Sequence, residues 1–220
     1  MKKVGKSIFY EDSQEVKQEP NNGIVEARNV ILVTEAEYLG HLKVLTEAYI
    51  KPLTPMLSDI ESQQLFGNID SVIKSSERLV EELSMTWTSN DMYNVVVEAA
   101  ATYLHEYVQY CSGLPTALSL LERLLNEREE FRDKVCESEG NVRGIGLQSC
   151  LLKPFQRLTR LPLLFEPLKS AGEPVMPAIS AITKLVEECN NSVEEVSSSP
   201  SNSNNENSSC RRSSSFYVDL

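Results

Sequence analysis

The sequence is poor in the residues that build tight turns and membrane spans. Its 220 residues include nine glycines and ten prolines, too few for an architecture of short strands joined by many turns. No apolar run approaches the roughly 20 residues that cross a bilayer. The basic stretch at residues 1–10 is followed by acids and has no apolar core, so it does not resemble a secretory signal. These absences favour a helical protein without a transmembrane segment.

Reactive side chains are also scarce. The chain has two histidines and five cysteines, and no two cysteines lie within three residues of each other. This pattern fits buried thiols in a reducing cytoplasm better than a disulfide or zinc framework. His105-Glu106 begins like a zinc-protease helix, but position 109 is glutamine, so one ligand is missing. We therefore expect a cytoplasmic protein with no metal, no cofactor and no covalent catalysis.

Acidic residues outnumber basic ones by 32 to 21, which gives a net charge of −11. Binding to nucleic acid depends on clustered lysine and arginine, so we expect no nucleic-acid partner. The charge reverses locally in residues 147–169, where Lys153, Arg157 and Arg160 would share one helix face. Spacing alone favours a solvated basic face or intramolecular ion pairs. The alternative is a docking strip for an acidic or phosphate-bearing partner.

Helical apolar spacing extends through the middle of the chain. Residues 1–26 lack it and are predicted to form a flexible arm, whereas the Ser/Asn-rich residues 197–220 are predicted to be disordered. The region between them, residues 27–196, is predicted to be all-α, a bundle of about six helices. The apolar stripes that define these helices span residues 38–49, 65–83, 96–111, 117–125, 147–168 and 179–189.

Local signals mark some helix ends. Ser58 and Glu61 form a capping box before the second stripe. The third stripe is predicted to stop at Ser112-Gly113, with a new helix starting at Pro115. Glycines and prolines at residues 172–177 are predicted to separate the last two helices.

An acid interrupts the first apolar line. Stepping back from Leu42 and Tyr38 by the same helical spacing places Glu35 where another apolar residue is expected. From periodicity alone, an exposed acid near a helix start, stabilised by the helix dipole, is the better interpretation.

Four blocks in the same order resemble the Dbl-homology domain, the exchange module of guanine nucleotide exchange factors for Rho-family GTPases. The third signature block is the clearest, and its Pro-Phe-Gln-Arg-Leu-Thr-Arg-Leu wording is closest to the ephexin-like branch. The resemblance covers roughly residues 27–196 and implies an elongated helical domain. The blocks are Thr34–Tyr38 with Lys51–Leu53, Leu65–Ile69, Tyr107–Cys111 and Leu151–Leu164.

The resemblance implies an exchange factor for a Rho-family small GTPase of Rho, Rac or Cdc type. Such a domain is a regulator and not an enzyme with covalent chemistry. It remodels the two switch segments of the GTPase, so that exchange factor and nucleotide weaken each other's binding. Two alternatives remain: an exchange-defective helical module that binds GTPases or acts as a scaffold, and a helical adaptor that binds lipid through the basic strip.

The resemblance also implies which residues contact the GTPase. Glu35 matches the acid that contacts the first switch, and Arg160 matches the base that contacts the second switch region. Asn190 matches an asparagine late in the last helix, with Asn191 as the alternative if the register shifts by one. The exchange mechanism requires Glu35, Arg160 and Asn190 to line one exposed surface. The remaining candidate GTPase-binding residues belong to the third block: Lys153, Gln156 and Arg157. For Gln156 and Arg157, which match the motif, a mainly structural role is the alternative.

Some features depart from the family pattern. The connection from Lys169 to Ile182 is short, which favours the exchange-defective alternative. Pro162 and Pro167 lie where a continuous helix is expected, and an interior proline can cost about 3 kcal/mol. No pleckstrin-homology domain is expected after residue 196, because the Ser/Asn-rich sequence follows.

Overall fold

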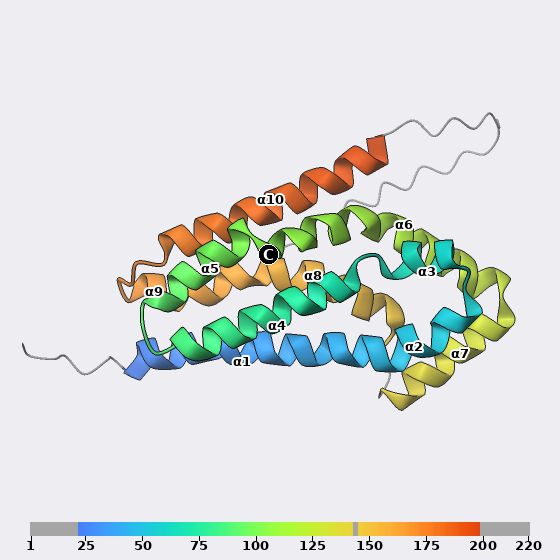
Figure 1. Ribbon diagram of the computed structural model, residues 1–220, viewed down its shortest axis with the longest axis horizontal. Helices are drawn as coiled ribbons and strands as arrows, with labels where there is room; N and C mark the ends of the chain where they lie inside the picture. The colour runs from blue at the N-terminus through green and yellow to red at the C-terminus, as the bar shows by residue number, and fades with distance from the viewer. Residues whose placement is uncertain (1–21, 143–144, 199–220) are drawn as a thin grey trace, which may run out of the picture.

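The structure, a computed structural model, describes residues 22–142 and 145–198. Every secondary-structure element in these two ranges is a helix, so the predicted all-α class is confirmed. Figure 1 shows the long helices lying side by side along the longest axis, with α1 (Asn22–Leu45) on one side and α10 (Met176–Ser198) on the other. The predicted tail at residues 199–220 and most of the predicted arm, residues 1–21, lie outside the described residues.

Short 3-10 and π turns connect or extend several α-helices. The remaining elements are η1 (Thr46–Ile50), α2 (Lys51–Leu53), η2 (Thr54–Met56), α3 (Asp59–Phe66), α4 (Ile69–Thr86), α5 (Asp91–Ala101), η3 (Tyr103–His105), α6 (Glu106–Glu127), α7 (Glu129–Asn141), α8 (Leu147–Arg160), η4 (Leu161–Phe165) and α9 (Glu166–Ser170).

The first helix is longer than its apolar stripe suggested. Helix α1 begins at Asn22, inside the stretch that was expected to be a flexible arm. The predicted line of Tyr38 and Leu42 is buried, and it extends back to Ile31 and Arg28 on the same face. The arm prediction therefore fails for residues 22–26, because the buried face of α1 begins at Arg28, nearly three turns before Tyr38, the first apolar residue used to place the helix.

Several predicted helix boundaries are wrong. The stripe over residues 96–111 is divided between α5 and α6, with η3 between them. The stripe over residues 65–83 is divided between α3 and α4 at Gly67, whose φ of 56° ends α3. Conversely, α6 does not stop at Ser112-Gly113 but continues through Pro115. Buried residues on both sides of that proline, such as Leu114 and Leu121, lie on one face of α6. Packing of this continuous face outweighs the local cost of an interior proline.

The prolines that depart from the family pattern are accommodated by short helices. The predicted continuous helix over residues 147–168 is divided into α8, η4 and α9. Pro162 lies in the first turn of η4 and Pro167 in the first turn of α9. A first-turn residue has no intrahelical partner for its N–H, so proline loses no hydrogen bond there.

A polar cluster fastens the short connection between α9 and α10 to the rest of the bundle. The Arg28 guanidinium of α1 donates to the Tyr93 hydroxyl of α5 at 2.9 Å and to the Thr88 carbonyl at 3.1 Å. It also binds Asn90 and forms an ion pair with Glu173, which lies just before α10. The Tyr93 hydroxyl donates to the same Glu173 carboxylate at 2.7 Å. This cluster, the Arg28 clamp, ties the start of α10 to α1 and α5.

The predicted capping box at the start of α3 is confirmed. The Ser58 hydroxyl accepts a hydrogen bond from the Glu61 N–H at 3.3 Å, and the Glu61 carboxylate accepts one from the Ser58 N–H at 3.0 Å. Arg128, at the start of α7, also donates to this carboxylate at 3.2 Å. These hydrogen bonds, first the one from Ser58 and then the one from Arg128, lower the pKa of Glu61 from 4.5 to about 2. Through Glu61, the start of α3 is therefore joined to the start of α7.

We expect Ser58→Ala to destabilise the protein by about 1 kcal/mol, the usual cost of removing a serine N-cap. Urea unfolding at neutral pH measures this difference. Ser62→Ala, inside the same helix, is the matched control, and an equal loss in both variants would contradict a specific capping role for Ser58.

The Glu61 carboxylate should also make stability depend on pH. Because its folded pKa lies near 2, below the usual 4.5, its stabilising effect is complete above pH 4.5 and is lost as the pH falls towards 2. The difference in unfolding free energy between the unmodified protein and Glu61→Gln should therefore shrink across this window. Denaturant titrations at several pH values measure it, with exposed Glu122→Gln as the control. A difference that stays constant from pH 6 to pH 2 would contradict the assignment.

Candidate functional site

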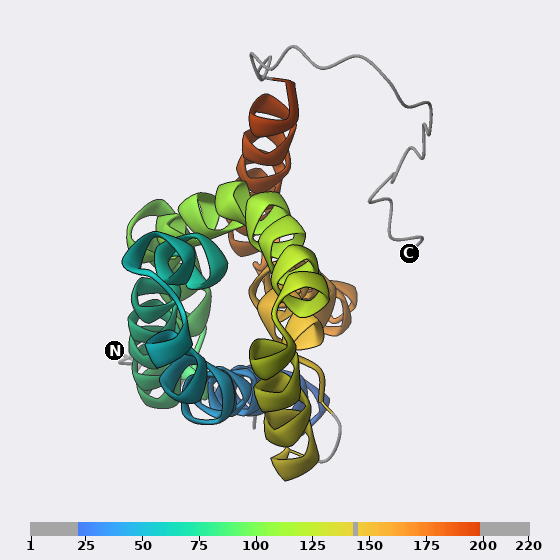
Figure 2. The same ribbon diagram turned by 90° about the vertical axis from the view of Figure 1, so that its right-hand side faces the viewer.

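Of the three helices that carry the predicted site residues, α8 lies beside both α1 and α10. Helix α8 packs against α1 on one side and against α10 on the other. Figure 2, which looks along the long axis, shows α8 on the flank of the bundle between α1 and α10. The fold therefore brings together segments that lie at the beginning, the late middle and the end of the described chain.

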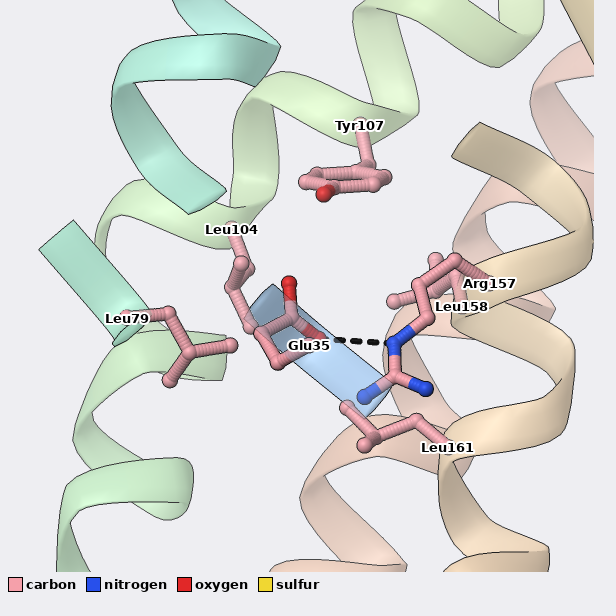
Figure 3. A pocket seen from close by; sticks show the side chains of 7 residues that line it. All are labelled: Glu35, Leu79, Leu104, Tyr107, Arg157, Leu158 and Leu161. Atoms are coloured by element: carbon pink, nitrogen blue, oxygen red, sulfur yellow. Dashed lines mark hydrogen bonds and ion pairs between the residues drawn. The ribbon is translucent and has the colours of Figure 1, made fainter. Parts of the chain in front are cut away.

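Glu35 is buried in the middle of α1 and is 1% exposed. Figure 3 shows its carboxylate turned towards α8, where the Nε of Arg157 donates to Oε2 at 2.7 Å. The Ser76 hydroxyl of α4 donates to the other oxygen, Oε1, at 2.9 Å. The interpretation of Glu35 as an exposed acid near a helix start is therefore wrong, because α4 and α8 each supply a donor that makes burial of the carboxylate possible.

Arg157 faces inward and not towards solvent. Its side chain is 11% exposed, and its Nη1 donates to the Thr34 hydroxyl of α1 at 3.1 Å. Its Nη2 is buried and has no hydrogen-bond partner among the described residues. Of the two interpretations of the basic face, Arg157 therefore fits the intramolecular ion pair. It does not belong to an open docking strip.

Apolar side chains surround this ion pair. A small pocket, seen in Figure 3, lies beside the pair. It is lined by Glu35 and Arg157 themselves and by Leu79, Leu104, Tyr107, Leu158 and Leu161. Excluding water from a charge pair strengthens its attraction and makes its directionality more important. Burial, followed by the nearby Glu35 carboxylate, raises the pKa of the Tyr107 hydroxyl. Tyr107 is therefore protonated at neutral pH, and it donates to the Tyr38 hydroxyl at 3.1 Å.

Arg160 and Asn190 occupy a different environment. Both are exposed, and neither side chain forms a hydrogen bond or ion pair with another described residue. Gln156 and Lys153 are half-buried on α8. The expectation that Glu35, Arg160 and Asn190 line one exposed surface is thus wrong for Glu35. Its carboxylate is buried, whereas Arg160 and Asn190 are exposed.

Helical geometry favours Asn190 over Asn191 as the site asparagine. At 100° per residue, Asn190 lies about 40° from the half-buried Val186 around α10. Asn191 lies about 180° from the buried Ile182, on the outer side of the helix. Both asparagines are exposed, but Asn190 borders the packed face and follows the buried Cys189.

Ser76 is a site residue that the sequence analysis missed. It occupies a buried line of α4 together with Val72, Leu79 and Leu83, at spacings of four, three and four residues. A small hydroxyl within an apolar line is the same kind of signal that singled out Glu35. Two such interruptions in neighbouring helices could have indicated that the two side chains meet.

No group of histidine, cysteine, aspartate or glutamate among the described residues could hold a metal ion, and no described helix is long and apolar enough to span a membrane. Cys111, Cys150 and Cys189 are buried free thiols as expected, but Cys136 is exposed. Cys210 lies outside the described residues.

Comparisons with known proteins agree with the resemblance found in the sequence blocks. The RhoGEF domain family matches residues 29–197. The chain is 32% identical to human Rho guanine nucleotide exchange factor 16 over 180 residues, covering 75% of this chain and 25% of the relative. It is 27% identical to rat Ephexin-1 over 198 residues, covering 83% of this chain and 28% of the relative. The chain thus spans about a quarter of the length of these relatives.

Solved structures share the fold. A structure of the Vav1 exchange factor matches with a TM-score of 0.74 and 22% identity, covering 79% of this chain and 50% of that one. The DH/PH domains of PDZ-RhoGEF, solved in complex with GTP-γ-S-activated RhoA, match with a TM-score of 0.74 and 20% identity, covering 83% and 57%. With the family match over most of its length, the chain belongs to the RhoGEF domain family.

Proposed function

We propose that this chain is a guanine nucleotide exchange factor for a Rho-family small GTPase of Rho, Rac or Cdc type. The observation that carries the proposal is the exposed and unengaged Arg160 on α8, the helix packed between α1 and α10, in a chain of the RhoGEF domain family. The related PDZ-RhoGEF domains were solved with RhoA bound. That complex supports a GTPase as the partner of this fold.

The proposed contact surface combines Arg160, Gln156 and Lys153 of α8 with Asn190 of α10. Arg160 supplies a fixed positive charge and Asn190 a neutral donor and acceptor, which suits recognition of a switch region with acidic and polar groups. The rest of the chain is strongly acidic, so this local positive charge would favour one orientation of an approaching GTPase.

The proposed mechanism involves no covalent step. The exchange factor binds the nucleotide-free GTPase more tightly than the nucleotide-bound one, so by linkage it lowers the affinity of the GTPase for GDP. GTP then refills the empty site and displaces the exchange factor. In this scheme the chain is a regulator and not an enzyme, needs no cofactor of its own, and acts in the cytoplasm.

The burial of Glu35 favours a second candidate function. If this acid must touch the GTPase directly for exchange to occur, a carboxylate that is 1% exposed cannot do so in the observed conformation. The chain would then be an exchange-defective module that binds a GTPase or acts as a scaffold. Measuring nucleotide release separately from binding distinguishes the two functions.

The full chain should accelerate release of fluorescent GDP from at least one GTPase in a panel of RhoA and the Rac and Cdc types. Fluorescence decay, with and without the chain at micromolar concentration, measures the release rate. Tight binding to nucleotide-free GTPase without any acceleration would support the exchange-defective module instead. Absence of both from a folded chain would refute a GTPase partner in this panel.

Arg160→Ala should weaken binding to the nucleotide-free GTPase at least tenfold, equivalent to about 1.4 kcal/mol. The physical reason is the loss of a charge-assisted contact. Calorimetry measures the affinity, and circular dichroism checks that the exposed site tolerates the change. Arg123→Ala, which removes another exposed arginine on α6, is the matched control. Equal affinities in both variants would remove Arg160 from the contact surface.

Asn190→Ala should slow GDP release at least fivefold, whereas Asn191→Ala should leave it within twofold. The two variants differ by one position on the same exposed stretch of α10, so each controls for the other. The reverse order of effects would show that the register of the last helix is shifted by one residue.

A further inference from the structure

The family resemblance placed Arg157 among the candidate GTPase-binding residues. Its hydrogen bonds are instead made within the protein, to residues of α1. Two of its three nitrogens donate into α1, to the Glu35 carboxylate at 2.7 Å and the Thr34 hydroxyl at 3.1 Å. The third, Nη2, is buried. A guanidinium bound in this way has little surface to offer a partner, whereas Arg160, three residues further along the helix, is exposed.

The Glu35 carboxylate is held at both oxygens from two different helices. Arg157 of α8 occupies Oε2, and Ser76 of α4 occupies Oε1. Ser76 is fully buried, so neither oxygen can exchange its partner for water without a rearrangement of the packing. The carboxylate therefore fixes the position of α8 relative to α1 and α4 through directional bonds, which apolar contacts alone cannot provide.

Two residues of the proposed contact surface, Gln156 and Arg160, lie within one helical turn of Arg157 on α8. Gln156 adjoins Arg157 in sequence, and Arg160 follows it by three residues on α8. A shift of α8 along or around its axis would displace both. Contact groups must be held within a fraction of an ångström and about 10–20° of the productive geometry to be effective.

We propose that Arg157 is a positioning residue, which acts on exchange through Glu35 and does not itself contact the GTPase. The inference rests on the proposed exchange function. The buried pair of Glu35 and Arg157 sets the position of α8 on α1. Arg160 and Gln156, which α8 carries, then contact the GTPase. Glu35 and Arg157 then form one unit, so loss of either removes the same contribution to exchange.

The Arg28 clamp provides a matched comparison. Arg28 is also a buried arginine of an ion pair that joins α1 to a distant segment. Its partner Glu173 precedes Asn190 by 17 residues, about 25 Å along the chain if that stretch were wholly helical. Arg28→Lys and Arg157→Lys therefore make the same chemical change in two buried ion pairs, and only Arg157 adjoins the contact residues on α8.

The experiment uses whichever GTPase of the panel (RhoA, Rac type or Cdc type) releases GDP fastest with the unmodified full chain. The rate of GDP release is measured at several concentrations of this GTPase. Arg157→Lys should lower the rate at saturating GTPase about tenfold. Arg28→Lys should leave that rate within twofold, although thermal unfolding shows both variants to be destabilised. Equal losses in the two variants would reduce Arg157 to a general stabilising role and overturn the inference.

A double-mutant cycle tests whether Arg157 acts through Glu35. Once Glu35→Gln has slowed exchange, adding Arg157→Lys should slow it by less than a further twofold. Adding Arg160→Ala to Glu35→Gln should instead slow exchange by at least a further fivefold. If the effects of Arg157→Lys and Glu35→Gln multiply, Arg157 makes its own contribution and the inference fails.

A milder variant covers the case in which Arg157→Lys does not fold. Ser76→Ala leaves the ion pair in place and frees one carboxylate oxygen, so it should lower the saturating rate two- to fivefold with helicity preserved. An unchanged rate would overturn the role of the anchor. No exchange by the unmodified chain on any GTPase would refute the proposed function itself, an outcome distinct from exchange that these variants leave intact.

Discussion

The ion pair between Glu35 and Arg157 is the constraint on which the arrangement of the site depends. It joins residues 122 positions apart in the sequence and lies where α1, α4 and α8 meet. Removing two charges from water costs about as much as their attraction returns, so a buried pair is weak support for stability. Its effect is on geometry, because a carboxylate held at both oxygens tolerates only a narrow range of helix positions. This geometric role explains why a charged pair occupies positions on these helix faces where apolar side chains could also pack.

Helix α1 carries two such pairs, and their order adds to the specificity of the fold. Arg28 and Glu35 lie seven residues apart on one buried face of α1 and have opposite charge. Glu173 of the α9–α10 connection pairs with the first, and Arg157 of α8 with the second. An alignment that exchanged these partners would bury arginine against arginine and glutamate against glutamate, at a cost of several kcal/mol. The sequence thus selects one alignment of α1 against the C-terminal half of the bundle.

The sequence was sufficient for the fold class and family because these depend on local periodicity and on ordered blocks of residues. The expected exposure of Arg160 is also observed, whereas its contact with a GTPase stays a prediction. The sequence was insufficient for Glu35, because periodicity shows that an acid lies on a buried line but not that Arg157 and Ser76 satisfy it. The predictions of some helix ends were wrong for a related reason. Pro115 carries a strong local signal, yet packing along α6 overrides it, and packing is not visible in a short window of sequence.

The division between buried and exposed charge bears directly on how exchange could be achieved without covalent chemistry. An exchange factor must distinguish two states of its partner that differ in the placement of the switch segments, so its contacts must be sensitive to small displacements. Long side chains at the end of a mobile helix would adapt to both states of the GTPase and would not distinguish one from the other. Anchoring α8 through the inward-facing Arg157 leaves Arg160 as an outward-facing base on a fixed support. Under the proposed exchange function, the buried Arg157 would hold α8 in place and the exposed Arg160 would contact the GTPase.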